Sequence, residues 1–140
     1  ITNNRDSKIA LVSDICIAPV VGPEVIIGST RMKSGTAQKM VLNMLTTATM
    51  IKLGKVYGNL MVDLKATNNK LCDRAKRIIC HATGADYTTA DKYLEKANCD
   101  TKLAILMLKT KIEKDEAKIL LDENEGTLKQ AILARSGVKV

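Results

Sequence analysis

The longest regular pattern of apolar positions lies between Thr36 and Leu53. Its apolar residues recur at spacings of three and four, which places them along one stripe of an α-helix. Gly54 follows at the point where a left-handed C-terminal cap is expected. We therefore predict a long helix over residues 36–53, whose stripe packs against a sheet, a partner chain or both. The stripe comprises Ala37, Met40, Val41, Met44, Leu45, Ala48 and Ile51.

The second half of the chain shows shorter helical patterns separated by turn and cap residues. Asn68 is predicted to cap a helix over residues 69–83, which Gly84 ends. Further short helices are expected from a Thr88–Asp91 capping box, after Asp100, over residues 113–123 and after Gly126-Thr127. Short helices with tight turns predict a small bundle. Its inward-facing residues are Leu71, Ala75, Ile78, Ile79, Ala82, Leu103, Ala104, Leu106, Met107, Ala117, Leu120, Leu121, Leu128, Ala131 and Ile132.

The first part of the chain carries a strand signal. A buried strand is predicted over residues 14–18, an apolar run that Pro19 ends. A short helical turn that Ser7 opens precedes it, and Ile1-Thr2 resembles the tail of another strand. Such a succession is typical of a parallel α/β sheet. A sheet with only one clear strand is too small to be stable by itself. We therefore expect the chain to be the C-terminal piece of a longer protein.

Composition narrows the classes of partner. The 140 residues suffice for one domain or two small ones, and with only 2% aromatic residues the core must be aliphatic. The formal net charge of +7 is spread over both halves, without a dense basic run or interleaved aromatic residues. We therefore expect no nucleic-acid partner. No stretch approaches the ~20 apolar residues that span a bilayer, so no membrane partner is expected.

The cysteines predict neither disulfides nor a metal site. Cys16, Cys72, Cys80 and Cys99 show no paired or Cys-x-x-Cys spacing, which favours the thiols of a cytoplasmic protein. Cys72, Cys80 and His81 lack an evident fourth ligand. We expect no metal or organic cofactor.

Residues 22–36 contain the most informative motif. A β-branched run, Val25 to Ile27, stops at Gly28 and gives way to hydroxyl residues and two cations before the long helix. Strand, small polar loop and helix N-terminus present backbone N–H groups and a positive dipole end to an anion. The side chains that would assist are Ser29, Thr30, Arg31, Lys33, Ser34 and Thr36. The alternative is that Ser34 or Thr36 merely caps the helix while the cations are solvated.

These same residues carry a resemblance. Residues 22–25 (Gly-Pro-Glu-Val) and 28–39 (Gly-Ser-Thr-Arg-Met-Lys-Ser-Gly-Thr-Ala-Gln-Lys) resemble the signature of the N-acetylmuramic acid 6-phosphate etherases. With the related glucokinase regulatory proteins, those enzymes belong to the sugar isomerase (SIS) family of phosphosugar-binding domains. The similarity continues through residues 41–45, 53–63 and 66–68 and weakens after about residue 85.

The resemblance implies a fold and a division of the chain. Residues 1–67 would form the C-terminal part of a three-layer α/β SIS domain with a parallel sheet, including the long helix and a connector. Residues 68–140 would form the compact helical C-terminal domain, which loosely resembles the three-helix ubiquitin-associated (UBA) type. We therefore expect a mostly helical chain with a small β remnant. A UBA-like packing does not imply ubiquitin binding.

The resemblance also implies a chemistry. The etherases remove D-lactate from the C3 ether of N-acetylmuramic acid 6-phosphate in cell-wall recycling, by proton abstraction at C2, expulsion of lactate and addition of water. The family's catalytic glutamates lie in the part that precedes this chain, upstream of Ile1, so no catalytic residue is assigned here. The substrate-binding candidates are Glu24, Ser29, Thr30, Arg31 and Lys33. Glu24 either bonds substrate hydroxyls or amide, or ties its loop to backbone N–H groups.

Three hypotheses remain open at this point. The chain is the C-terminal part of a cytoplasmic, homodimeric etherase that is inactive without its upstream part. Alternatively, it belongs to a non-catalytic sugar-phosphate-binding regulator of the glucokinase regulatory protein type. The third possibility is an oligomerisation module whose interface is the helix over residues 36–53. Two correctly placed upstream glutamates would favour the lyase over the regulator.

Overall fold

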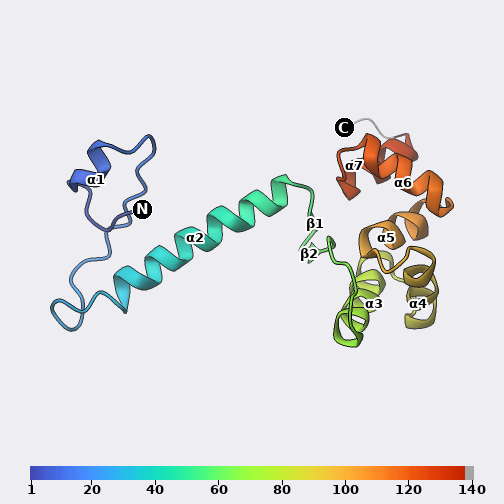
Figure 1. The fold of residues 1–140 in the computed structure, drawn as a ribbon, viewed down its shortest axis with the longest axis horizontal. Helices are drawn as coiled ribbons and strands as arrows, with labels where there is room; N and C mark the ends of the chain where they lie inside the picture. Colours follow the sequence, from blue (N-terminus) through green and yellow to red (C-terminus); the bar gives the residue numbers. More distant parts are fainter. Residues whose placement is uncertain (138–140) are drawn as a thin grey trace. The chain divides into compact units, whose positions relative to one another are not determined.

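The structure, a computed structural model, describes residues 1–137 and is mostly helical. The chain folds into two compact units, residues 1–49 and the residues from Met50 on. Figure 1 colours the chain from one end to the other and labels its elements. Sheet pairing within the described residues is limited to one small antiparallel hairpin and an isolated bridge between Lys65 and Asp100.

The first unit begins with turns and one short helix, α1 (Lys8–Leu11), at the position predicted for a helical turn after Ser7. The backbone N–H of Thr2 donates to the carbonyl of Ile17 at 3.1 Å, but no ladder follows from this bond. The predicted strand over residues 14–18 is therefore wrong, as is the strand reading of residues 25–27. A strand needs a ladder of hydrogen bonds to a neighbouring strand, and neither segment forms one.

Helix α2 (Lys33–Lys52) is the long helix of the chain and runs without interruption (Figure 1). It begins three residues before the predicted start, and Gly54 has the expected positive φ of 66° just beyond its end. Val41 is its only buried residue. The remaining large apolar side chains of the helix, which are exposed, are Met40, Leu42, Met44, Leu45, Met50 and Ile51.

A β-hairpin follows α2. Strand β1 (Val56–Tyr57) pairs antiparallel with β2 (Leu60–Met61), in the register Val56 to Met61 and Tyr57 to Leu60. The predicted remnant of a parallel sheet is thus not what the described residues contain. The segment after the hairpin contributes Val62 and Ala66 to the core of the second unit.

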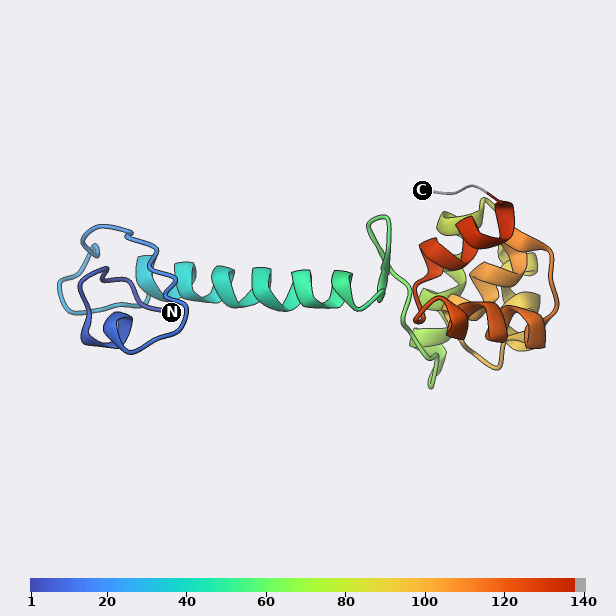
Figure 2. The same cartoon turned by 90° about the horizontal axis from the view of Figure 1, so that it is seen from above.

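Within the described residues, five helices complete the second unit: α3 (Asn69–Thr83), α4 (Tyr87–Lys96), α5 (Thr101–Thr110), α6 (Lys114–Glu123) and α7 (Leu128–Ser136). Figure 2 gives a second view of the chain. Local caps explain several of these boundaries. Asn68 accepts from the Leu71 amide at 2.9 Å, and Gly84 ends α3 with a φ of 77°. Asp100 accepts from the Leu103 amide at 3.0 Å. These three predicted caps are confirmed.

One predicted cap is wrong. Helix α4 is capped by Asp86, whose Oδ1 accepts from the Thr89 amide at 2.8 Å, and not by Thr88. Asp86 also accepts from the Thr89 hydroxyl at 2.9 Å. This pair of hydrogen bonds fixes the helix start two residues earlier, because both carboxylate oxygens have partners on the first turn.

Helix α5 is the centre of the second unit. It packs against α3, α4, α6 and α7, and every residue from Thr101 to Leu108 is buried. A helix that is apolar on all sides requires such a position. All of the inward-facing residues predicted for the other helices lie in or against the same core. The last three residues of the predicted second domain, 138–140, lie outside the described residues.

Candidate functional site

The five candidate ligand-binding residues lie on or beside one loop, residues 22–32, which leads into α2. The loop contains bends and turns in place of a strand, and two of its glycines, Gly22 and Gly28, have positive φ values of 72° and 85°. These backbone conformations are accessible to glycine at little cost. The loop is therefore folded by its glycines and its polar contacts.

Glu24 makes the central contacts of this loop. Its Oε2 accepts from the Lys33 amide at 3.0 Å, and its Oε1 accepts from the Ser34 amide at 3.0 Å. Both amides belong to the first turn of α2, where backbone N–H groups have no partner within the helix. Met32, which precedes the helix, has no side-chain oxygen and cannot cap it. Glu24 takes over that role from nine residues upstream.

Three further bonds close the loop. The Lys33 ammonium donates to the Pro23 carbonyl at 2.8 Å, beside the Glu24 contacts. The Ser29 amide donates to the Ile26 carbonyl at 3.0 Å. The Gly35 amide donates to the Thr30 carbonyl at 2.9 Å, and a Cβ at position 35 would lie 3.2 Å from that oxygen. The approach is close enough to favour glycine at this position.

The electrostatics of the loop follow from these contacts. The Ser34 amide, followed by the Lys33 amide, lowers the pKa of Glu24 below its ordinary value, because both hydrogen bonds stabilise the charged carboxylate. The positive end of the α2 dipole favours the same charge state. Glu24 is thus an anion at neutral pH, and it already occupies the N-terminus that the sequence offered to a ligand.

The other four candidates carry hydroxyl or cationic groups, whereas Glu24 carries a carboxylate. Ser29 is half-buried, whereas Thr30, Arg31 and Lys33 are exposed. Their hydroxyl and cationic groups suit a phosphate ester or a sugar hydroxyl. Ser34 and Thr36 both lie inside α2, so the alternative that one of them caps this helix is wrong. The structure places four of the candidates on one loop and Lys33 at the first position of α2, and it gives backbone partners to both Glu24 and Lys33.

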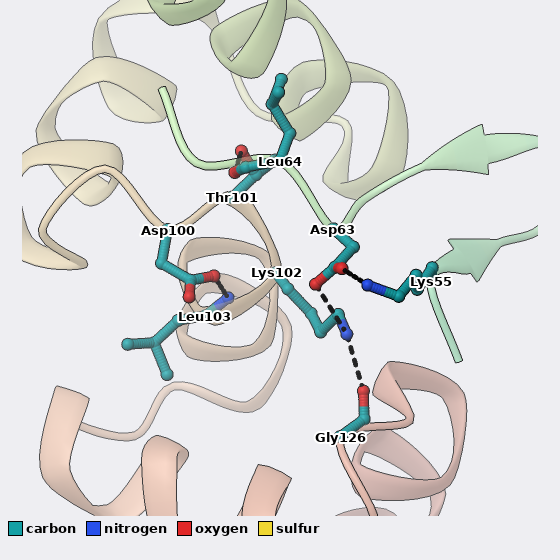
Figure 3. A network of polar contacts seen from close by, with 8 residues as sticks. All are labelled: Lys55, Asp63, Leu64, Asp100, Thr101, Lys102, Leu103 and Gly126. Carbon is teal, nitrogen blue, oxygen red and sulfur yellow. Dashed lines mark hydrogen bonds and ion pairs between the residues drawn. The ribbon is translucent and has the colours of Figure 1, made fainter. Parts of the chain in front are cut away.

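A second polar cluster was missed by the sequence analysis (Figure 3). Lys102 is buried within α5, yet its ammonium lies 3.3 Å from Asp63 Oδ1 and donates to the Gly126 carbonyl at 2.9 Å. Lys55 binds the other oxygen of Asp63 at 2.6 Å. The hydrogen bond from Lys55 is the main cause of a lowered pKa of Asp63, and the charge of Lys102 acts in the same direction.

This cluster connects three segments of the second unit. Lys102 joins α5 to the segment after the hairpin and to the turn before α7. The Thr101 hydroxyl adds a bond of 2.8 Å to the Leu64 carbonyl on the same segment (Figure 3). The available sequence signal was a single lysine in the apolar run Thr101–Leu108, since a buried lysine requires a partner.

Two further properties bear on function. Within residues 1–137 no three His, Cys, Asp or Glu side chains gather as a metal site would require, and the four cysteines are free thiols. Nor does any helix of this part have both the length and the apolar character to cross a membrane.

Comparison with known proteins identifies the relatives of this chain. No protein-family model matches it. It is 58% identical over 132 residues to an N-acetylmuramic acid 6-phosphate etherase of Clostridium botulinum (strain Loch Maree / Type A3), a match that covers 94% of the chain and 44% of the relative. Etherases of the same name from Clostridium beijerinckii and Clostridioides difficile are 59% and 57% identical, also over 94% of the chain, and each is covered to 43%.

The chain thus spans less than half the length of the curated relatives that it matches. The matches nevertheless cover 94% of this chain's own residues at 57–59% identity. By sequence, the chain is homologous to the C-terminal portion of the N-acetylmuramic acid 6-phosphate etherases.

Proposed function

We propose that the chain acts as the C-terminal part of an N-acetylmuramic acid 6-phosphate etherase. In this proposal the complete enzyme is a carbon–oxygen lyase that releases D-lactate and leaves N-acetylglucosamine 6-phosphate. The observation that carries the proposal is the identity of 57–59% over 94% of the chain to proteins of that name. No observation on this chain favours the regulatory alternative over the lyase.

The proposed division of labour follows from what the chain offers. Elimination of lactate requires a base for the proton at C2 and an acid for the leaving oxygen, followed by addition of water. We assign those groups to the part of the relatives that this chain does not match. The chain itself supplies binding groups, and the 140 residues alone are expected to release no lactate.

The loop before α2 is the proposed contact with the phosphosugar. Ser29 and Thr30 provide hydroxyl donors, and the guanidinium of Arg31 and the ammonium of Lys33 provide charge for a phosphate ester. Glu24 belongs to the same site as the residue that shapes the loop. The support for this assignment is that four of the residues lie on one loop, with Lys33 at the adjoining first position of α2, and that hydrogen bonds close this loop.

The exposed apolar residues of α2 support a larger assembly. We propose that residues 1–67 belong to an SIS-type phosphosugar-binding domain and that residues 68–140 form a helical domain of UBA-like type, against which Val62 and Ala66 of the connector pack. Within that assembly α2 would be covered by the rest of the α/β domain and by a second subunit of a homodimer. The free thiols fit a reducing, cytoplasmic compartment.

A graft tests the proposal. The matching stretch of the Clostridium beijerinckii etherase is replaced by this chain, and D-lactate release from N-acetylmuramic acid 6-phosphate is measured. We expect activity, and we expect Arg31→Ala to raise KM by about tenfold or more because a phosphate contact is lost. Arg5→Ala, which removes an exposed arginine elsewhere in the first unit, is the matched control. Phosphosugar binding without any lactate release would support the regulator and contradict the lyase.

A further inference from the structure

The carboxylate that binds the N-terminus of α2 belongs to a residue outside this helix. Its first turn contains no acidic residue, although carboxylates favour that position. Met32 precedes it and offers no acceptor. The two carboxylate oxygens of Glu24 instead bind the amides of Lys33 and Ser34, each at 3.0 Å. The contact closes a loop of ten residues with a single side chain.

Glu24 is not alone in closing this loop. The Lys33 ammonium reaches back to the carbonyl of Pro23, the residue before Glu24, at 2.8 Å. On the opposite side the Gly35 amide holds the Thr30 carbonyl at 2.9 Å. These bonds tie Pro23, Glu24 and Thr30 to the first turn of α2 and so hold the segment that carries Ser29 and Arg31. That segment thereby has a defined backbone before any ligand arrives, which lowers the ordering cost of binding.

The occupied amides also limit where a phosphate can bind. A ligand anion at the Lys33 and Ser34 amides would have to displace Glu24 and would face its negative charge. The exposed groups of Thr30 and Arg31, together with half-buried Ser29, meet no such obstacle. The side chains of the loop are therefore better placed for an anion than the helix N-terminus itself.

We propose that Glu24 is a positioning residue, which caps α2 from a distance and holds residues 28–32 in the form that presents Ser29, Thr30 and Arg31 to the phosphosugar. The ligand side of this inference rests on the proposed function. The capping side does not, and it can be tested on the 140-residue chain alone.

The first experiment measures amide hydrogen exchange at Lys33 and Ser34 by NMR. Glu24→Gln keeps the size of the side chain, but its NH₂ group cannot accept, so at least one of the two bonds is lost. We expect exchange of these amides to become about tenfold faster or more, with little change in α3–α7. Unchanged exchange at both amides would overturn the inference, whatever the activity of the chain.

The second experiment restores the cap by another residue. The substitution Met32→Asp, at an exposed position, supplies an acceptor for the Ser34 amide as an ordinary N-cap does. In the Clostridium beijerinckii graft, Glu24→Ala is expected to raise KM for N-acetylmuramic acid 6-phosphate by about tenfold with a smaller change in kcat. The double variant Glu24→Ala/Met32→Asp should recover most of that loss.

The outcomes separate the two proposals. If Glu24 touched the substrate, a new cap at position 32 would not restore KM, and failure of this rescue would overturn the positioning role. If the exchange data behave as expected but Arg31→Ala leaves KM unchanged, the cap stands and the proposed binding loop fails. Met32→Asp alone is the matched control, because it adds the new carboxylate while Glu24 remains in place.

Discussion

Helices α2 and α5 are both rich in apolar residues, and their surroundings differ completely. From Thr101 to Leu108 every residue of α5 is buried, whereas Val41 is the only buried residue of α2. Helix α5 is enclosed by α3, α4, α6 and α7. In α2, Leu42 and Met50 are 50% and 46% exposed and lie off the predicted stripe, so this helix too is apolar on more than one side.

An apolar helix must be buried by other segments, but its own sequence does not show which segments these are. The second unit itself contains the four helices that cover α5. Nothing comparable surrounds α2 within its own unit. A helix that is apolar on several sides is ordinarily buried, and this expectation is the physical basis for proposing that α2 functions within a larger fold.

Truncation of one leucine in each helix gives the largest contrast. Leu106→Ala in α5 is expected to lower the free energy of unfolding by about 2–5 kcal/mol, because a fully buried side chain leaves a cavity. Leu45→Ala in α2, where the side chain is 48% exposed, should change it by about 0.5 kcal/mol or less. Urea unfolding followed by circular dichroism measures both.

A large effect of Leu45→Ala would contradict this expectation. A loss as large as that at Leu106 would mean that α2 is covered in solution, either by the second unit or by a second copy of the chain. Sedimentation at several protein concentrations would show that association directly. A strictly monomeric chain with a small Leu45 effect would agree with the description of α2 given above.

The helical half of the fold was predictable because its signals are local. Asn68, Gly84 and Asp100 act on residues within four positions of themselves, so their roles can be read from neighbouring letters. The cap of α4 was misplaced because Asp86 and Thr88 are both good cap residues two positions apart. The structure chooses Asp86, whose carboxylate reaches both the amide and the hydroxyl of Thr89.

The first unit and both polar clusters were harder to predict because their contacts are not local. A strand over residues 14–18 depends on a pairing partner that the apolar run itself does not specify. Glu24 reaches nine and ten residues forward to Lys33 and Ser34. The sequence alone did not decide whether its carboxylate binds the substrate or the backbone N–H groups of its own loop. Lys102 meets Asp63 from a distant part of the chain, which no periodicity reveals.

The turn after α2 extends the comparison of α2 with α5, because Gly54 already belongs to the second unit. Gly54 and Gly58 both have positive φ, 66° and 60°, but only Gly54 is crowded. A Cβ at position 54 would lie 2.6 Å from the Thr127 hydroxyl oxygen, and one at position 58 would meet nothing within 4 Å. Gly58→Ala therefore reports the backbone cost alone.

We expect Gly58→Ala to cost about 1–2 kcal/mol of unfolding free energy. Gly54→Ala should cost about 1–3 kcal/mol more, because Thr127 must move to admit the methyl group. Thermal and urea unfolding provide the values. Equal losses would indicate that the turn before α7 yields freely, and that the segment after α2 is held less firmly than its buried position implies.

The buried cation of α5 allows a test of its polar contacts. Lys102→Met removes the ion pair with Asp63 and leaves the Gly126 carbonyl without this donor. We expect a loss of about 1–3 kcal/mol, below that of a fully buried pair because Asp63 is partly exposed and keeps Lys55. Lys55→Met, which removes the more exposed partner, should cost about 0.2–1 kcal/mol.

The same pair predicts a pH dependence. The pKa of Asp63 is lowered in the folded chain, so its contribution is fully present above the unfolded-state pKa and is lost as the pH falls through the folded-state value. The stability difference between the wild type and Lys102→Met should therefore shrink in acid. A difference that stays constant from neutral pH to below the folded-state pKa would assign the loss to packing of the lysine stem.

The smallest expected effect concerns how the helices begin. Asp100 directly precedes α5 and accepts from the Leu103 amide at 3.0 Å, whereas Glu113, in the same position before α6, makes no such bond. Asp100→Ala should lower the unfolding free energy by about 1 kcal/mol, and Glu113→Ala by only a few tenths. Both can be measured by urea unfolding in the same buffer. Equal losses would mean that the charge near each helix start matters more than the hydrogen bond. The contrast between α5, which the adjacent Asp100 caps, and α2, which Glu24 caps from nine residues upstream, would then lose its basis.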